Sequence, residues 1–429
     1  MTNSINRRAF NRSSILSASA LAIGTAVPDG WVRSLAARLT DEKQKDRILI
    51  VIQLSGGNDG LNTIVPYADE RYLKARPKLA IPKSDVITLD GSVGLHPSMR
   101  GIAKLIEDQK FATIHGVGYA NPNRSHFESM DIWHSCQRKE SRGSDGWLGR
   151  LFSHAMTGDR VDSMGLHLGG EPMPLALVGR GIQTPSIATV DQFRWKGKTD
   201  SMREADNGTS SEPGAAKQGN MESGGASERE ADGAGLLDFV SASTTAAMQA
   251  SDRLEKALAT SDSAGDFPDS QLGEKLKVIS RLILAGLNTK VYYVTLDGFD
   301  THANQAVAHA GLLKQWSEAL SAFHRRLDQA GQGDRALVMT FSEFGRRVSE
   351  NASQGTDHGA AAPAFLSGPH FGKPFYGEQP SLSDLDDGDL KFKIDFRSLY
   401  ATVIEEWLGQ PADPVLGENY SKIDGIKLG

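Results

Sequence analysis

Short apolar runs alternate with amphipathic stretches along most of the chain. Ile48–Leu54 consists of β-branched residues and leucine, broken only by Gln53, which is typical of a strand buried on both faces. Residues 96–109 instead space their apolar side chains at helical intervals, which predicts a helix with one buried face. The same patterns predict strands at 111–117, 175–178, 186–190, 291–296, 336–341 and 365–366, and helices at 127–134, 237–258, 272–287, 314–330 and 396–408.

Strands that alternate with helices predict an α/β fold with a mainly parallel central sheet and helices on both faces. We expect residues 45–429 to form one such domain. Residues 196–235 break the pattern, because they are rich in Gly, Ser, Glu and Asp and contain no Val, Ile, Leu or Phe. Such a segment buries too little apolar surface to offset its ordering entropy, so we expect a disordered surface insertion.

The first 44 residues have the pattern of an export signal and leader. Arg7-Arg8 is followed by Ala9-Phe10 and by an uncharged, Ser/Ala-rich run at 15–27. This run is too short for a membrane span, and it favours a twin-arginine signal over a structural helix or an ordinary secretory signal. We therefore expect a periplasmic or otherwise extracytoplasmic protein whose mature form has no integral membrane span.

Charge and cysteine content exclude some classes of function. The net charge of -6, from 47 basic and 53 acidic residues, provides no basic field for nucleic acid. Cys136 is the single cysteine, which excludes an internal disulfide and a cysteine-based zinc cluster.

Acidic residues and histidines gather just after the predicted strands. In an open α/β sheet, ligands bind outside the carboxyl ends of the strands. Carboxylate and imidazole groups there are suited to a divalent metal ion such as zinc, calcium or magnesium. The candidate metal ligands are Asp59, Asp300, His302, Glu343, Asp357 and His358.

Each candidate ligand also has an ordinary structural interpretation. Asp59 lies in Gly-Gly-Asn-Asp-Gly, which is a typical turn composition. Asp297, Asp300 and His302 fall within six positions after a strand, and such groups destabilise one another unless a cation is present. A helix N-cap would explain one of these three residues but not all of them.

The late candidates allow two interpretations as well. Glu343 could form an ion pair with Arg346 or Arg347; alternatively, Arg346 could bind an anionic substrate. Asp357-His358 lies in a glycine-flanked loop, where an imidazole beside a carboxylate is a common metal-ligand arrangement.

Ser125 and its neighbour Arg124 precede a predicted helix. Ser125 could be an ordinary N-cap, or a nucleophile stabilised by a metal and by the amides of the helix N-terminus. Arg124 could hold an anionic ester. The histidines interpreted as structural or solvated are His96, His115, His126 and His134.

Several motifs together resemble a family of exported bacterial proteins, domain of unknown function 1501, which is placed near the alkaline phosphatase and sulfatase superfamily. The likeness runs from Ile48 onward and rests on Ser55-Gly56-Gly57-Asn58-Asp59-Gly60, Arg124-Ser125-His126-Phe127, Gly298-Phe299-Asp300-Thr301-His302, Phe341-Ser342-Glu343-Phe344-Gly345-Arg346 and Thr356-Asp357-His358-Gly359.

The resemblance implies an alkaline phosphatase-like sandwich with divalent metal ions at the strand ends. On that pattern Asp59 is the first-strand ligand, Ser125 takes the place of the nucleophile, and Asp300 with His302 matches the later Asp/His pair. Asp357 and His358 complete the site. The chain departs from the pattern at Ser342-Glu343, where a phosphatase has Asp-His, and Cys136 lacks the Pro and Arg that accompany formylglycine formation.

We therefore expect an exported, metal-dependent hydrolase whose substrate is a small anionic phosphate or sulfate ester. The first alternative is a non-catalytic exported binding protein that keeps the fold. The second is a metal-free serine esterase, in which the Gly56-Gly57-Asn58-Asp59 block would supply an oxyanion-binding Asn. A hydrolase should lose activity on chelation, whereas a binding protein should turn over no ester.

Overall fold

The computed structural model describes residues 46–155, 163–182, 184–188 and 266–428. The expected signal at 1–44, the expected insertion at 196–235 and the predicted helix at 237–258 lie outside these residues. The chain divides into two compact units, Met1–Arg47 and Ile48–Gly429, and the second contains all the elements described below.

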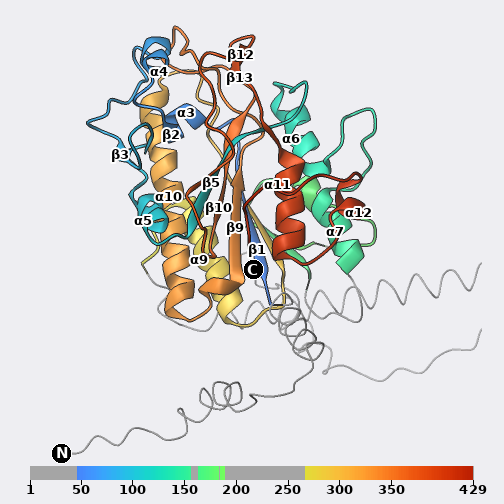
Figure 1. The fold of residues 1–429 in the computed structure, drawn as a ribbon. Coiled ribbons are helices and arrows are strands. Elements are labelled where there is room, and N and C mark those ends of the chain that lie inside the picture. The colour runs from blue at the N-terminus through green and yellow to red at the C-terminus, as the bar shows by residue number, and fades with distance from the viewer. Residues whose placement is uncertain (1–45, 156–162, 183, 189–265, 429) are drawn as a thin grey trace, which may run out of the picture. The chain divides into compact units, whose positions relative to one another are not determined.

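Nine described strands form the main sheet, which confirms the predicted mainly parallel architecture (Figure 1). The strands are β1 (Ile48–Leu54), β5 (Phe111–Gly118), β6 (Gly165–Leu168), β7 (Ser186–Ile187), β8 (Val291–Leu296), β9 (Ala336–Phe341), β10 (Ala362–Ser367), β11 (Phe375–Tyr376) and β14 (Ile394–Asp395). Their order is β11-β5-β10-β9-β1-β8-β6-β7, and β14 pairs with β5. β10 runs antiparallel to both β5 and β9, while β1 is parallel to β8 and β9.

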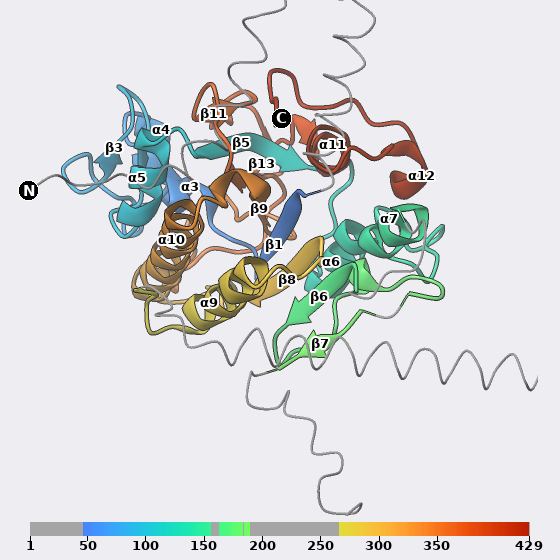
Figure 2. The ribbon, with the colours of Figure 1, turned by 90° about the horizontal axis from the view of Figure 1, so that it is seen from below.

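Helices cover both faces of the sheet, as predicted (Figure 2). One face carries α5 (Arg100–Glu107), α9 (Gln271–Leu284) and α10 (Gln305–Gln329); the other carries α6 (His126–Ser135), α7 (Trp147–Ala155), α11 (Phe396–Thr402) and α12 (Asp413–Leu416). The side chains of β1 are apolar on both faces of the sheet, so both faces need a layer of helices. Ile50 and Ile52 pack in the core with Trp316 of α10, whereas Leu49 and Val51 pack in the core with Tyr400 of α11. Alternating side chains of one strand thus face two apolar layers.

Smaller elements surround the upper end of the sheet in Figure 1. They are α3 (Gly60–Thr63), β2 (Ile64–Val65), α4 (Glu70–Ala75), β3 (Ile87–Thr88), β4 (Gly94–Leu95) and the hairpin of β12 (Leu385–Asp386) and β13 (Asp389–Leu390). β2, β4 and β3 form a three-stranded sheet of their own. Among the described residues, no helix is long and apolar enough to cross a membrane.

Two predicted elements differ from the structure. Leu175–Leu177 is a short 3-10 helix instead of a strand, because the amides of Leu177 and Val178 donate to carbonyls three residues back, those of Pro174 and Leu175. α10 begins at Gln305 rather than at residue 314. The added residues include three alanines and two leucines and no proline, so nothing stops the helix from starting earlier.

Candidate active site

Parallel strands bring distant loops to one edge of the sheet. β1, β5, β8 and β9 all run in the same direction, so the loops that follow them meet at their carboxyl ends. Gly56 and Gly57 allow the first loop to approach closely. Both have positive φ, 114° and 80°, and a Cβ on Gly56 would lie 2.3 Å from the backbone nitrogen of Asp300.

Three histidines surround Asp300 at this edge. We call His126, Asp300, His302 and His358 the His–Asp cluster. Asp300 Oδ1 lies 3.0 Å from His302 Nε2 and 3.1 Å from His358 Nε2, and Asp300 Oδ2 lies 3.4 Å from His126 Nε2. The ligand atoms of His126, Asp300 and His358 all lie within 4.8 Å of one another, and His302 Nε2 is 2.9 Å from His358 Nε2. Three potential ligand atoms therefore converge, and the Nε2 atom of His302 lies beside two of them.

The second nitrogen of each ring is fixed by an acceptor. His126 Nδ1 lies 2.9 Å from Glu343 Oε1, His302 Nδ1 lies 3.3 Å from Asp357 Oδ1, and His358 Nδ1 lies 2.7 Å from the carbonyl oxygen of Arg124. A carbonyl can only accept, so His358 Nδ1 donates there, and in the neutral ring the lone pair lies on Nε2. Carboxylates favour the same tautomer for the other two rings.

A donor set of this kind fits a divalent cation. Lone pairs on Nε2 would face the Asp300 carboxylate and one another, an arrangement that is unfavourable until a positive charge lies between them. Among the described residues, His126 Nε2 is buried and lacks a hydrogen-bond partner. The hydrogen bond to Glu343 also raises the pKa of His126, with a further contribution from Asp300, so the site attracts positive charge.

Asp300 is ionised. Burial opposes its ionisation, but the hydrogen bond from Arg346 and the positive charge of that guanidinium act against burial, and the pKa of Asp300 is lowered to about 2. Arg346 Nη2 donates to Asp300 Oδ1 at 2.7 Å. The same Nη2 also donates to the carbonyls of Gly56 and Phe299, while Nε and Nη1 donate to those of Gly57 and Thr356. The Arg346 side chain, predicted to bind substrate, is therefore buried beneath Asp300 and joins the loops after β1, β8 and β9.

Asp59, a predicted metal ligand, lies below the cluster and is not brought into it. Its Oδ2 pairs with Arg76 Nη1 at 2.5 Å and accepts a hydrogen bond from Gln305, while its Oδ1 accepts from the amide of Leu61 at the start of α3. Burial opposes its charge, but Arg76 lowers the pKa of Asp59 below its usual value. Its carboxylate is thus compensated within the protein.

Glu343 and Asp357 contact the Nδ1 atoms of two cluster histidines, on the side away from Asp300. Besides contacting His126, Glu343 Oε1 accepts a hydrogen bond from the amide of Gly56 at 2.9 Å, and the residue is buried. Asp357 is held by Asn351 Nδ2 at 3.1 Å, and this hydrogen bond, together with His302, lowers the pKa of Asp357. Both predicted ligands therefore orient histidines in this structure.

Ser125 and Arg124 lie at the open side of the cluster. Ser125 is exposed and immediately precedes His126, the first residue of α6; its side chain makes no capping hydrogen bond with the described residues. Arg124 pairs with Asp389 of the β12–β13 hairpin, and 42% of its side chain is exposed. The carbonyl oxygen of Arg124 contacts His358 Nδ1, and Ser125 is bonded directly to His126, so both residues adjoin the cluster.

Sequence reasoning missed His126 as a member of the cluster. The sequence pattern alone predicts a structural or solvated histidine at this position, yet His126 follows β5 as Asp300 follows β8 and Glu343 follows β9. Its place after a parallel strand was the available signal.

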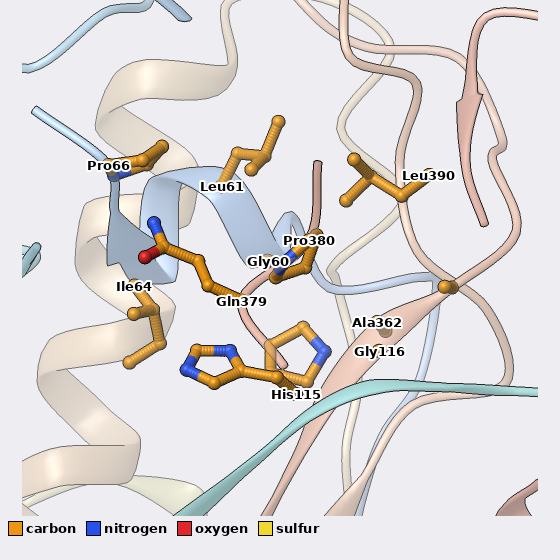
Figure 3. A pocket seen from close by; sticks show the side chains of 12 residues that line it. Gly60, Leu61, Ile64, Pro66, His115, Gly116, Ala362, Gln379, Pro380 and Leu390 are labelled. Carbon is orange, nitrogen blue, oxygen red and sulfur yellow. The ribbon is translucent and has the colours of Figure 1, made fainter. Parts of the chain in front are cut away.

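A separate small cavity lies near α3 and β5 (Figure 3). His115 and Gln379 extend into it, and its volume of about 20 Å³ is enough for roughly one water molecule. None of its lining residues belongs to the His–Asp cluster. It is therefore too small to serve as the substrate site.

Comparisons with known proteins give one match over most of the chain. The profile of the family "Protein of unknown function (DUF1501)" matches residues 46–407. No curated protein matches the chain.

Solved structures match only distantly. A sulfatase from Pseudoalteromonas is 11% identical, with a TM-score of 0.39, and the match covers 93% of this chain and 75% of that one. A protein of the alkaline phosphatase superfamily from Vibrio parahaemolyticus is 10% identical, with a TM-score of 0.37 and coverages of 87% and 69%. A phosphonate monoester hydrolase from Silicibacter pomeroyi is 9% identical, with a TM-score of 0.36 and coverages of 87% and 77%. At these TM-scores the likeness assigns no activity, whereas the profile match, which covers most of the sequence and agrees with the predicted motifs, shows that the chain belongs to the DUF1501 family.

Proposed function

We propose that the His–Asp cluster binds a divalent metal ion and that the protein hydrolyses a phosphate or sulfate ester. The observation that carries this proposal is the set of three Nε2 atoms around one ionised carboxylate, with each Nδ1 fixed by an acceptor. Zinc suits such imidazole-rich sites best. When bound, the metal would polarise an ester oxygen and lower the pKa of a nearby hydroxyl.

The exposure of the side chains suggests which residue attacks the ester and which one holds its anionic group. Ser125 offers an exposed hydroxyl beside His126 at the N-terminus of the ten-residue helix α6, where backbone amides favour an anion. We assign it the attack on phosphorus or sulfur. Arg124 is the better candidate for holding the anionic group, because 42% of its side chain is exposed, whereas the side chain of Arg346 is fully buried.

The metal-free esterase is less well supported. Asn58 would have to face a substrate oxyanion, but it is fully buried, and its Oδ1 contacts Thr63 and His309.

Metal analysis of single-site variants tests the proposal. Asp300→Asn, His126→Ala and His358→Ala should each lower the bound metal and the hydrolysis of an ester panel together, because each removes a proposed ligand. His154→Ala is the matched control, since His154 is an exposed histidine on α7. Wild-type protein that holds no metal after incubation with zinc would overturn the metal site. Metal binding without turnover of any phosphate or sulfate ester would support the non-catalytic alternative.

We also propose export by the twin-arginine route, on the strength of Arg7-Arg8 and the uncharged run that follows. Replacing both arginines with lysine should retain the protein inside the cell. Unchanged appearance outside the cytoplasm would contradict this route.

A further inference from the structure

Two large apolar side chains near the cluster are almost fully exposed. Among the described residues, Phe127 is 87% and Val307 is 84% exposed, and the other exposed large hydrophobic residues, Leu73 and Met173, reach only 43% and 37%. Large apolar side chains gain free energy from burial, so two left this far in water stand out.

Both side chains lie in the first turns of helices that begin at the cluster. Phe127 directly follows the proposed ligand His126 in α6, and Val307 is the third residue of α10, which starts shortly after His302. Both helices start at the edge of the sheet that carries the cluster (Figure 1). The exposed positions around Val307 are uncharged as well, namely Ala306 and Ala308. We call Phe127, Ala306, Val307 and Ala308 the apolar rim.

The chemistry of the rim contrasts with that of the cluster. An ester of phosphate or sulfate has an anionic end and an organic end. The charged cluster suits the anionic end, and the organic end must then lie near the residues around it. Sugars and nucleosides need polar partners for their hydroxyl groups, which the rim side chains do not offer.

We infer that the apolar rim binds the organic group of the substrate, and that the protein prefers esters of hydrophobic alcohols or phenols. This inference rests on the proposed function. A protein or lipid surface is a poorer occupant, because the rim residues belong to two separate helices and do not form one broad apolar patch. An exposed polar residue also precedes each part of the rim, Ser125 before Phe127 and His302 before Ala306.

Inert analogues of the substrate test the inference in the zinc-loaded, full-length protein. Benzylphosphonate and methylphosphonate, with the corresponding sulfonates, carry the same anion on a large or a small apolar group. Calorimetry should show that the wild type binds the benzyl compound about tenfold more tightly than the methyl compound. Phe127→Ala should remove most of this preference and leave the affinity for the methyl compound unchanged. Leu73→Ala, at an exposed leucine on α4, should keep the preference.

The outcomes separate this inference from the proposed function. Equal binding of the benzyl and methyl compounds by the wild type would overturn the role of the rim and leave the anion site standing. The same result follows if the preference survives in the double variant Phe127→Ala with Val307→Ala. Binding of none of the four anions by zinc-loaded protein would overturn the proposed ester site and the rim together. Phe127 is exposed, so its variants should melt like the wild type, which serves as the check on folding.

Discussion

At the scale of single residues, Glu343 fixes the orientation of one proposed ligand. Its buried carboxylate joins the amide of Gly56 to the Nδ1 of His126. Glu343→Gln keeps the shape of the side chain but loses the charge that favours the Nδ1–H tautomer. We expect zinc affinity to fall roughly 10- to 100-fold, as for other residues that orient metal-bound histidines.

A zinc titration with a competing chelator measures this loss. Glu140→Gln removes an exposed carboxylate from the loop after α6 and should leave the affinity unchanged. Equal zinc affinity in Glu343→Gln and wild type would show that His126 needs no such support.

A substitution at Ser125 can distinguish a catalytic role of this residue from a role as a helix cap. Since its side chain caps nothing among the described residues, Ser125→Ala should change the free energy of unfolding by less than ~0.5 kcal/mol while removing most turnover. Ser270→Ala gives the matched comparison, because Ser270 Oγ accepts a hydrogen bond from the amide of Gly273 at the start of α9. That variant should lose ~1 kcal/mol of stability and keep its turnover. Normal turnover in Ser125→Ala would point to water as the attacking group.

At the scale of elements, the turn after β1 determines where Asp300 can lie. Gly56→Ala would place a Cβ 2.3 Å from the backbone nitrogen of Asp300, at a φ of 114° that alanine rarely adopts. We expect a loss of roughly 3 kcal/mol in unfolding free energy and weaker zinc binding, because the loop that carries Asp300 must move.

Urea unfolding and zinc titration of the same variant measure both effects. Gly91→Ala is the control, because no described atom outside its chain neighbours lies within 4 Å of a Cβ placed there, and it should change neither quantity. A Gly56→Ala protein with wild-type stability and zinc affinity would contradict the close packing of the two loops.

Strands and helices of the core were predictable because their patterns are local. The sequence predicts strands at Ile48–Leu54, Val291–Leu296 and Ala336–Phe341, and the structure has strands with those bounds. The prediction of a strand at 175–178 was wrong, since four apolar residues alone do not distinguish a strand from a 3-10 turn.

The site was only partly predictable, because the role of each side chain depends on contacts with residues far away in the sequence. Asp300, His302 and His358 meet as expected, but whether Asp59 faces a metal or a buried cation depends on Arg76 and Gln305, and the latter lies 246 residues away. No spacing in the sequence shows which strand-end loop lies beneath the others.

At the scale of the whole molecule, buried neutral histidines make stability depend on pH. Burial lowers the pKa of His134 and His324 to about 3 and that of His96, His115 and His309 to about 4. In the unfolded chain these groups take up protons below pH ~6.5. The stability they contribute is therefore fully present above pH 6.5 and is lost as the pH falls from 6.5 towards 4.

Each unit of pKa difference corresponds to ~1.4 kcal/mol, so five such groups should cost several kcal/mol over this range. Urea unfolding at pH 7.5, 6 and 5 measures the decrease. His154→Gln, at an exposed position, should leave the pH dependence unchanged, whereas His324→Gln should reduce it. A free energy of unfolding that stays constant from pH 7.5 to pH 5 would contradict the neutral state of these histidines.

The cluster also has a consequence for how the protein folds. His126 and Glu343 meet across 217 residues of sequence, and His302 and His358 across 56, so the metal-binding geometry exists only when the strands that carry them are paired. A zinc ion held there would act as a long-range cross-link, and it would favour the native state by mass action. At a free zinc concentration one hundred times the dissociation constant, the native chain should gain ~2.7 kcal/mol over the unfolded one. The melting temperature would then report how much of the protein holds zinc, without any measurement of turnover.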